Sequence, residues 1–379
     1  MWKTKNLRRK IMKFKTNKDE ILDSLSTAQY FISTGSTLPL LSNILFEAEG
    51  ENLYLSATDM DIYVRIKSGV NKIEAPGRTT IPKKIIALIK EFSNNEIKIE
   101  ADKNDNIKVQ CKKSSYKIHG LPAEDFPVLR PDEKKLETVQ IPHNILKEII
   151  KNISYAALRD NTKRNLNGVF MRFEGNKIEA VATDAHRLAV YTAELKTNVK
   201  AKFEYIIPLK TINEVAKVLK DEESKMVEIN FYEKMLEFKI DEIEIITRVI
   251  DENYPNYAQV VPKEFNMVVQ ADRVEFEGAV KRAAMITSEK AKAIMIKLDK
   301  NKMYISAQAQ DEGEAFEELD IAYDGDPVDV SYNAVYLMDV LKVIETDKIE
   351  IKLISSVNPG VLKPAGDENF TYVVMPIRK

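Results

Sequence analysis

The chain has 379 residues, with 57 Lys or Arg, 59 Asp or Glu and a formal net charge of −2. This length exceeds what one hydrophobic core supports and predicts several domains. A content of 44% hydrophobic and 31% charged residues excludes intrinsic disorder. We find no apolar run near the roughly 18 residues that a membrane-spanning helix needs. The near-neutral charge excludes a protein that holds nucleic acid by strong electrostatic attraction alone.

The start of the chain is basic but lacks the apolar stretch of a signal peptide. We therefore expect Met1–Ile11 to be a short basic extension, or the product of an upstream start codon, because Met12-Lys13-Phe14 reads like a natural beginning. The single cysteine, Cys111, excludes an intrachain disulfide and suits a reducing cytoplasm.

The sequence contains a threefold internal repeat. A segment of eight residues recurs with a similar pattern, and the alanine at its sixth position is Ala57, Ala182 or Ala307, at intervals of 125 residues. A period of this length indicates a duplicated domain and not a solenoid turn. Each copy predicts a strand and a turn, followed by another strand.

Two helices are predicted in each copy, again on the same period. The earlier helices are expected to start near Lys18, Pro142 and Asp272, and the later ones at Pro82, Pro208 and Asn333. Proline suits the first turn of a helix, where its missing N–H needs no partner. Asp272 followed by Glu275 resembles a capping box.

Alternating segments such as Ile97–Glu100 and Ile243–Ile246 predict the strands. Each copy is also expected to close on a proline after a strand, at Phe126-Pro127, Tyr254-Pro255 and Met375-Pro376. Two helices packed on antiparallel sheets make an α+β module. We predict an extension over residues 1–11 and modules over 12–130, 138–262 and 263–379.

The predicted helices from Pro142 and Pro208 each have an apolar stripe and a basic polar face. The apolar positions are Ile145, Leu146, Ile149, Ile150 and Ile153 in one, and Ile212, Val215, Ala216 and Leu219 in the other. The opposite positions are Asn144, Lys147, Lys151 and Asn152, and Lys210, Asn213, Lys217 and Lys220. Taken alone, such lysines are better explained as a solvated helix surface. If equivalent helices line a hole, however, the lysines would contact phosphates without reading bases.

Five stretches resemble the bacterial sliding-clamp family, the β subunit of DNA polymerase III, in that family's order. They are Thr37–Asn43, Gly120–Pro127, Leu166–Gly168, Ala182–Ala189 and Tyr372–Arg378. The resemblance covers about Met12 to Lys379. It implies three clamp-type domains that form half of a six-domain ring, a head-to-tail homodimer around duplex DNA. Such a protein is a cytoplasmic processivity factor for DNA replication and repair, without catalysis, cofactor or metal.

The resemblance also implies an apolar cleft between the second and third modules, which accepts short linear motifs of the replicative polymerase, the clamp loader and repair proteins. The matching positions are Leu166, Thr183, His186, Arg187, Leu188, Pro255, Val260, Asn333, Tyr336, Val357, Val373, Val374, Met375, Pro376, Ile377 and Arg378. Aliphatic residues and methionine adapt to varied partners, and His186, Arg187 and Arg378 would fix the peptide backbone. Ala185 stands where the family commonly has glycine, and Gln259 replaces an arginine.

Two further surfaces follow from the resemblance. The first module of one subunit would meet the third module of the other through Tyr116, Ile118, Met285, Ile286, Glu314 and Glu317. The two glutamates belong to an acidic run that starts at Asp311. The DNA-facing residues would be Lys147, Lys151, Lys210 and Lys217 on the helices and Arg159, Lys163 and Arg164 in a loop.

Two other classes of protein are compatible with parts of the sequence. An enzyme would use Asp184 and His186, which share a face if they lie on a strand, but no nucleophile elbow or phosphate-binding glycine loop accompanies them. The three histidines lack zinc-like spacing. A repeat-built protein-binding scaffold unrelated to DNA also fits the length and charge. Its mass in solution and its retention on circular DNA would separate it from a clamp.

Overall fold

A computed structural model describes residues 11–33, 35, 37–93, 95–131, 134–160, 162–288, 292–310 and 312–378. The predicted extension lies outside these residues except for Ile11. The chain divides into two compact units. Unit 1 extends to His143 and includes Lys217–Val249, and unit 2 comprises Asn144–Ala216 and Ile250–Lys379. The second copy of the repeat therefore contributes to both units.

Unit 1 contains two antiparallel sheets. The five-stranded sheet has the order β5 (Lys72–Ala75), β1 (Met12–Asn17), β7 (Glu96–Ala101), β8 (Asn106–Cys111) and β9 (Ser114–His119). The eight-stranded sheet has the order β10 (Glu137–Pro142), β13 (Met226–Phe231), β14 (Met235–Ile240), β15 (Ile243–Arg248), β4 (Ile62–Ser68), β3 (Asn52–Thr58), β2 (Asn43–Glu49) and β6 (Gly77–Pro82). Helices α1 (Lys18–Gln29) and α2 (Lys84–Lys90) pack together, and α1 covers β3 and β4. Pairing of β15 with β4 joins strands of the second and first copies in one sheet.

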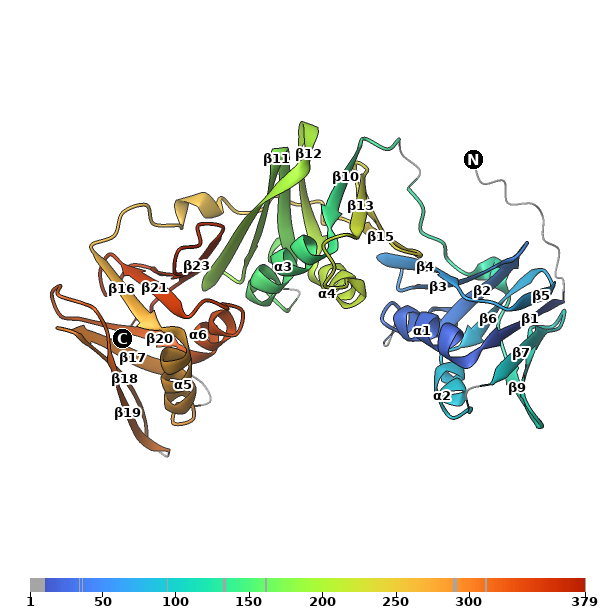
Figure 1. Ribbon diagram of the computed structural model, residues 1–379, viewed down its shortest axis with the longest axis horizontal. Helices are drawn as coiled ribbons and strands as arrows, with labels where there is room; N and C mark the ends of the chain where they lie inside the picture. Colours follow the sequence, from blue (N-terminus) through green and yellow to red (C-terminus); the bar gives the residue numbers. More distant parts are fainter. Residues whose placement is uncertain are drawn as a thin grey trace. The chain divides into compact units, whose positions relative to one another are not determined.

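Unit 2 is also built on two antiparallel sheets (Figure 1). The six-stranded sheet has the order β11 (Gly168–Thr183), β12 (Arg187–Pro208), β23 (Phe370–Val374), β22 (Gly360–Pro364), β21 (Lys348–Leu353) and β16 (Met267–Asp272). The four-stranded sheet has the order β19 (Gly313–Asp320), β18 (Lys302–Ala309), β17 (Ala293–Asp299) and β20 (Val328–Asn333). Helices α5 (Arg273–Ala284) and α6 (Ala334–Leu341) pack against each other. Pairing of β12 with β23 joins the second copy to the third.

The predicted helix starts are confirmed, but the role given to proline is wrong. Helix α1 begins at Lys18, α3 (His143–Ile153) follows Pro142, and α4 (Leu209–Val218) follows Pro208. The prolines end the preceding strands β6, β10 and β12 instead of opening the helices. Strands β6 and β10 are the edge strands of their sheet, where a residue without an N–H is tolerated.

Side-chain caps begin the two helices of the third copy. Asp272 accepts a hydrogen bond from the backbone N–H of Glu275 at 2.9 Å, and Asn333 accepts one from Val335 at 2.9 Å. These bonds satisfy N–H groups that have no partner within the helix. The predicted cap at Asp272 is confirmed.

The apolar stripes of α3 and α4 face the core, as their spacing predicts. Of the predicted apolar positions, Ile145 and Ala216 are half-buried and the others are buried, namely Leu146, Ile149, Ile150, Ile153, Ile212, Val215 and Leu219. Asn152, predicted to lie on the polar face, is buried, and its Nδ2 donates to the Glu148 carbonyl at 3.0 Å. This hydrogen bond within the helix is what allows a polar side chain there.

The prediction that each copy closes on a proline after a strand holds only for Met375-Pro376, which follows β23. Phe126 follows a 3-10 turn over Ala123–Asp125, and Tyr254 lies in an irregular segment after β15. The α+β class with antiparallel sheets is confirmed. Across the described ranges, every helix is too short or too polar to cross a membrane.

Candidate partner-binding cleft

The tight turn between β11 and β12 forms one edge of the candidate site. Thr183 Oγ1 accepts from the backbone N–H of Ala185 at 3.1 Å and donates to the Arg187 carbonyl at 2.5 Å. Asp184 Oδ1 accepts from the backbone N–H groups of His186 and Arg187 at 2.9 and 3.0 Å. The threonine and aspartate thus replace the hydrogen bonds that the strands lose at the turn.

The Asp184 carboxylate and the His186 imidazole have different partners. Both residues lie in a turn and not on a strand, so the shared face that a dyad would need is absent. The Asp184 carboxylate binds the backbone of His186, while the imidazole stacks beside the Tyr336 ring with centroids 6.4 Å apart. Within the described part of the chain, no cluster of three or more His, Cys, Asp or Glu side chains is arranged to hold a metal ion.

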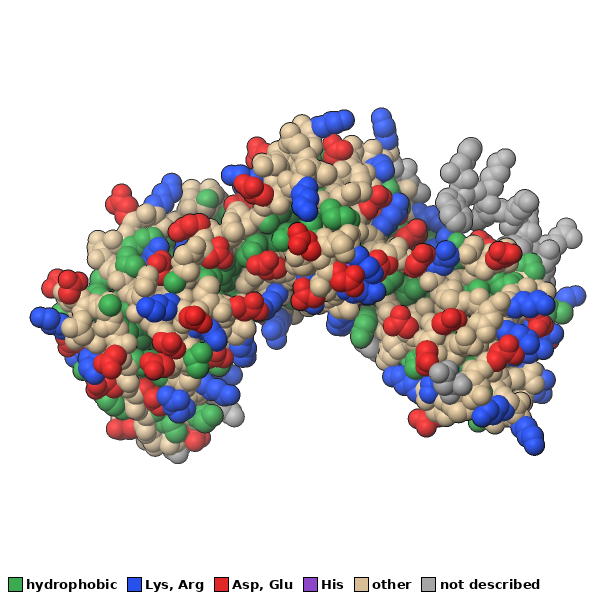
Figure 2. Space-filling view, viewed as in Figure 1, with side chains coloured by type: hydrophobic (Ala, Val, Ile, Leu, Met, Phe, Trp, Pro, Cys, Tyr) green, Lys and Arg blue, Asp and Glu red, His purple; other side chains and the backbone are tan. Residues whose placement is uncertain are grey.

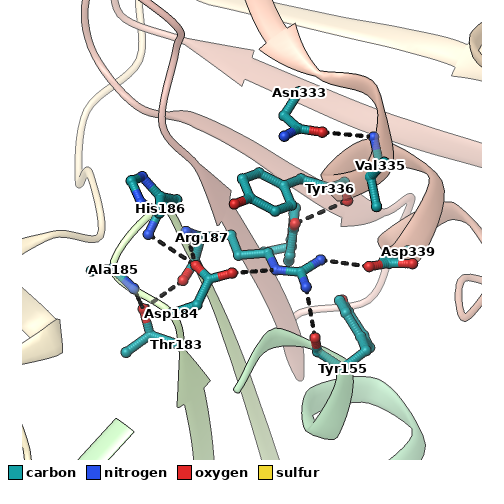
Figure 3. Close-up of polar contacts among 11 residues, drawn as sticks. Tyr155, Thr183, Asp184, Ala185, His186, Arg187, Asn333, Val335, Tyr336 and Asp339 are labelled. Carbon is teal, nitrogen blue, oxygen red and sulfur yellow. Dashed lines mark hydrogen bonds and ion pairs between the residues drawn. The ribbon is translucent and has the colours of Figure 1, made fainter. Parts of the chain in front are cut away.

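Arg187 is the most highly connected side chain at this turn (Figure 3). Its Nε donates to Asp184 Oδ2 at 3.0 Å, Nη1 to Asp339 Oδ2 at 2.7 Å, and Nη2 to the Tyr155 carbonyl at 2.8 Å. The guanidinium lies 4.5 Å from the centroid of the Tyr336 ring, in cation–π contact. The residue is only 7% exposed.

An apolar pocket opens beside the turn and encloses about 190 Å³. It is lined by Leu166, Thr183, Ala185, Arg187, Leu188, Pro255, Asn256, Tyr257, Val260, Val373 and Met375. Leu188 and Val373 are paired across β12 and β23, and both belong to a buried cluster with Phe170 and Val361. A well-packed sheet therefore supports the floor of the pocket.

The segment after Ile250 forms a second wall. The ring centroids of Tyr254 and Tyr257 lie 5.1 and 5.9 Å from the centroid of the Phe170 ring. The Tyr257 hydroxyl donates to the Glu179 carboxylate, which also accepts from Arg172 at 2.9 Å. Burial, followed by the hydrogen bond to Glu179, raises the pKa of Tyr257 well above its usual value, so the hydroxyl remains a donor.

The end of the chain forms the third wall. The Met375 N–H donates to the His186 carbonyl at 2.9 Å, and the Ile377 N–H donates to the Ser331 carbonyl at 2.8 Å. The Tyr372 hydroxyl donates to the Tyr336 carbonyl at 2.9 Å. The first two bonds hold the segment that follows β23 between the turn at His186 and the end of β20 at Ser331.

Half of the positions predicted for the cleft line this pocket. They are Leu166, Thr183, Arg187, Leu188, Pro255, Val260, Val373 and Met375. His186 and Tyr336 stack on each other on the α6 side, and Asn333 caps α6. Neighbouring residues of a strand point to opposite faces of the sheet. Val374 therefore points away from the pocket that Val373 lines, and it is fully buried.

The remaining predicted positions lie at the surface or partly buried near the end of the chain. Val357 is 66% exposed in the turn between β21 and β22, Pro376 is half-buried, and Ile377 and Arg378 are exposed. Ala185 lines the pocket, although it was named from the sequence only as a departure from the family. Asn256 and Tyr257 were missed as lining residues. Their only signal is their position between Pro255 and Val260, since an irregular segment has no periodicity to interpret.

The residues predicted for the dimer interface lie on two edge strands and the end of α5. In unit 1, β9 ends its sheet and carries Tyr116, 41% exposed, and Ile118, which is buried. In unit 2, Met285 is 67% exposed and Ile286 half-buried.

The predicted interface glutamates lie on β19, the edge strand of the other sheet of unit 2. Glu317 accepts two hydrogen bonds from Arg282 at 2.8 and 2.7 Å, and Glu314 accepts one from Gln308. Asp311 lies outside the described residues. Phe316, 69% exposed on β19, was missed.

The predicted DNA-facing residues differ in their surroundings. Lys147 is half-buried, Lys151 pairs with Glu345, Lys210 is exposed, and Lys217 lies 4.3 Å from the Tyr30 ring centroid. Arg159, Lys163 and Arg164 are exposed in the loop before β11. Figure 2 shows basic and acidic side chains interspersed over the visible face.

Two structural features define the class of protein: an α+β module repeated three times and an apolar pocket where the second copy meets the third. Three family models match the chain. They describe the N-terminal domain of the DNA polymerase III beta subunit over residues 12–130, its central domain over 140–256 and its C-terminal domain over 258–378.

Relatives match over nearly the whole chain. The beta sliding clamp of Pseudomonas putida is 29% identical, with 97% of this chain and 100% of that protein covered. The beta sliding clamp of Staphylococcus aureus is 26% identical at the same coverage. The crystal structure of the DNA polymerase III subunit beta from Pseudomonas aeruginosa is 28% identical, with a TM-score of 0.92, 97% of this chain and 100% of that chain covered. The chain belongs to the DNA polymerase III beta subunit family, the bacterial sliding clamps, and the predicted resemblance is confirmed.

Proposed function

We propose that the protein is a processivity factor: a ring-shaped homodimer that encircles duplex DNA and tethers the replicative polymerase through the apolar cleft. The clamp loader and repair proteins would use the same cleft in turn. The observation that carries this proposal is the full-length similarity to beta sliding clamps together with the pocket beside Leu188 and Val373. The protein would act in the cytoplasm, without catalysis, through modules over residues 12–130, 138–262 and 263–379.

The chemistry of the pocket supports weak, exchangeable tethering. Its lining is dominated by aliphatic and aromatic residues, and each apolar partner side chain that it buries contributes roughly 1.5–3 kcal/mol. Ordering of the partner and loss of its free motion offset much of that gain. Among related structures, a sliding clamp from Pseudomonas aeruginosa is bound to griselimycin, and the C. crescentus beta sliding clamp has PEG bound to a region described as a beta-motif tethering region. We propose that the pocket described above is the corresponding region.

Ring closure is supported by complementary edge strands. Strands β9 and β19 each end a sheet of the described chain, and an edge strand presents backbone groups that pair readily with another chain. Lys112, Lys113 and Lys117 lie on or beside β9, whereas β19 carries Glu314, Glu317 and Glu318. We propose that β9 of one subunit pairs with β19 of the other. A head-to-tail contact of this kind closes into a ring if its rotation allows.

Encirclement also accounts for the net charge of −2. Topology would hold the DNA, so the protein needs only sequence-independent phosphate contacts. We assign these contacts to Lys147, Lys151, Lys210 and Lys217 and to the loop with Arg159, Lys163 and Arg164. A strongly cationic lining would hinder sliding.

The test compares closed circular plasmid with the same plasmid linearised, after loading by the clamp loader. The protein is expected to remain on the circle and to leave the linear form through its ends, as measured by gel filtration of the complexes. Equal retention on both forms would exclude encirclement and favour the scaffold hypothesis. Equilibrium sedimentation should give twice the chain mass of 43.3 kDa.

A further inference from the structure

The guanidinium of Arg187 is already occupied by the protein itself. Each of its three nitrogens donates a hydrogen bond of 2.7 to 3.0 Å to an acceptor within the chain. The acceptors are two carboxylates and one backbone carbonyl, and one face of the group lies over Tyr336. Three of the five N–H donors are engaged in this way, and the residue is only 7% exposed, so little of the guanidinium is accessible to a partner although Arg187 lines the pocket.

The acceptors come from three separate segments. Asp184 belongs to the turn between β11 and β12, the Tyr155 carbonyl to the 3-10 turn after α3, and Asp339 to α6. The first two segments belong to the second copy of the repeat and α6 to the third. Arg187 therefore connects the pocket turn to the helix that carries Tyr336 (Figure 3).

Both carboxylates are sheltered from solvent, with side-chain exposures of 11% for Asp184 and 18% for Asp339. Without Arg187, Asp184 would lose its paired cation, and Asp339 would keep only Lys342, whose exposed Nζ lies 3.7 Å from Asp339 Oδ1. Uncompensated buried charge is strongly unfavourable, so the turn and α6 would move apart or admit water. The walls of the pocket would then lose their spacing.

We infer that Arg187 is a positioning residue that holds the turn Thr183–Arg187 against α6 and does not itself bind the partner. It offers the pocket only its aliphatic stem, as long charged side chains commonly do. Since Arg187 carries the only charge among the described lining residues, the pocket selects uncharged apolar side chains. This inference rests on the proposed function of the cleft and specifies how that cleft is kept in shape.

The experiment measures the affinity for griselimycin, by isothermal titration calorimetry on the full-length protein, in Arg187→Met, Asp339→Asn and the double variant. Asp339 does not line the pocket. A positioning role predicts that each single change weakens binding by about threefold to thirtyfold. It also predicts that the double variant binds no more weakly than the weaker single variant, because both changes break one connection.

The matched controls are Arg273→Met and Glu277→Gln, which break a 2.9 Å ion pair within α5. They should cost stability without changing affinity. Thermal unfolding of every variant shows whether it is folded at the assay temperature. If Arg187→Met does not fold, the affinity of Asp339→Asn alone tests the positioning role. A loss of affinity in Arg187→Met with none in Asp339→Asn would overturn the inference, because it indicates direct contact with the ligand. So would additive losses in the double variant.

A failure of the proposed cleft has a different signature. Val260 lies at the exposed edge of the pocket, and Val260→Asp should abolish griselimycin binding. If Val260→Asp binds normally, or if the wild-type protein does not bind at all, the cleft assignment is wrong and the inference falls with it. Loss of binding in Val260→Asp with normal binding in Asp339→Asn overturns the inference alone.

Discussion

Met60 and Ala185 occupy the same position of the same turn in successive copies of the repeat. Both have a left-handed backbone, with φ of 86° and 76°. In each turn a threonine hydroxyl two residues earlier accepts the backbone N–H, at 3.0 Å for Met60 and 3.1 Å for Ala185. The hydrogen bonds hold a left-handed conformation that residues with a Cβ atom disfavour.

Ala185→Gly should therefore stabilise the protein. Relief of the left-handed strain contributes about 1–2 kcal/mol. This gain exceeds the free-energy cost that arises because glycine makes the unfolded chain more flexible. We expect the free energy of unfolding to rise by about 0.5–1 kcal/mol, measured by urea denaturation. The control Ala193→Gly lies within β12 and should lower it by a similar amount. A loss of stability in Ala185→Gly would show that the turn is not strained.

Charging the end of α5 should separate the proposed dimer. The variant with Met285→Asp and Ile286→Asp places two carboxylates beside the acidic strand β19, where repulsion and desolvation oppose association. We expect monomers of 43.3 kDa by equilibrium sedimentation. Val274→Asp changes a residue that is 62% exposed at the start of α5 and should leave the dimer intact. A dimeric double variant would place the interface elsewhere.

Removing residues 375–379 should abolish binding in the cleft and leave the dimer intact. The truncation deletes the pocket side chain of Met375 and its backbone bond to His186. We expect griselimycin affinity to fall at least 100-fold, about 2.7 kcal/mol, as measured by calorimetry. Glu368→Gln breaks an exposed ion pair with Lys363 and serves as the control. Unchanged affinity after truncation would contradict the assignment of this segment to the pocket.

Stability should fall in mild acid because of His143. Burial lowers the pKa of its imidazole, whose Nδ1 accepts from the backbone N–H of Lys220 at 3.5 Å. The unfolded chain takes up a proton near pH 6.5, and the folded chain only at lower pH. The contribution of His143 is therefore complete above about pH 6.5 and is lost as the pH falls toward the folded pKa.

His143 changes the free energy of unfolding by at most about 1.4 kcal/mol per pH unit. Urea denaturation between pH 7.5 and 5 should show a smaller decrease for His143→Gln than for the wild type, whereas above pH 7 the two curves should run parallel. Identical slopes below pH 6.5 would show that His143 binds protons equally well in both states.

The repeat and its local structure were predictable from the sequence. The spacing of Ala57, Ala182 and Ala307 revealed three copies, and helical periodicity placed Leu146 and Ile149 in the core, because both signals depend on neighbours within a few turns. Family membership followed from motifs that are continuous in the chain, such as Ala182–Ala189. The burial of Asn152 was missed because its side chain satisfies its hydrogen bond within the helix, at the Glu148 carbonyl, and polarity alone gives no sign of that.

The tertiary structure alone decided how the site is assembled. The partners Arg187 and Asp339 are 152 residues apart, and the pairing of β12 with β23 joins two copies of the repeat. Neither contact leaves a pattern in the local sequence, because the periodicity around each residue reflects only the strand or helix to which that residue belongs. Hydrophobic spacing specifies which face of an element is buried. Which distant charge then meets Arg187 depends on how the packed elements bring their polar groups together.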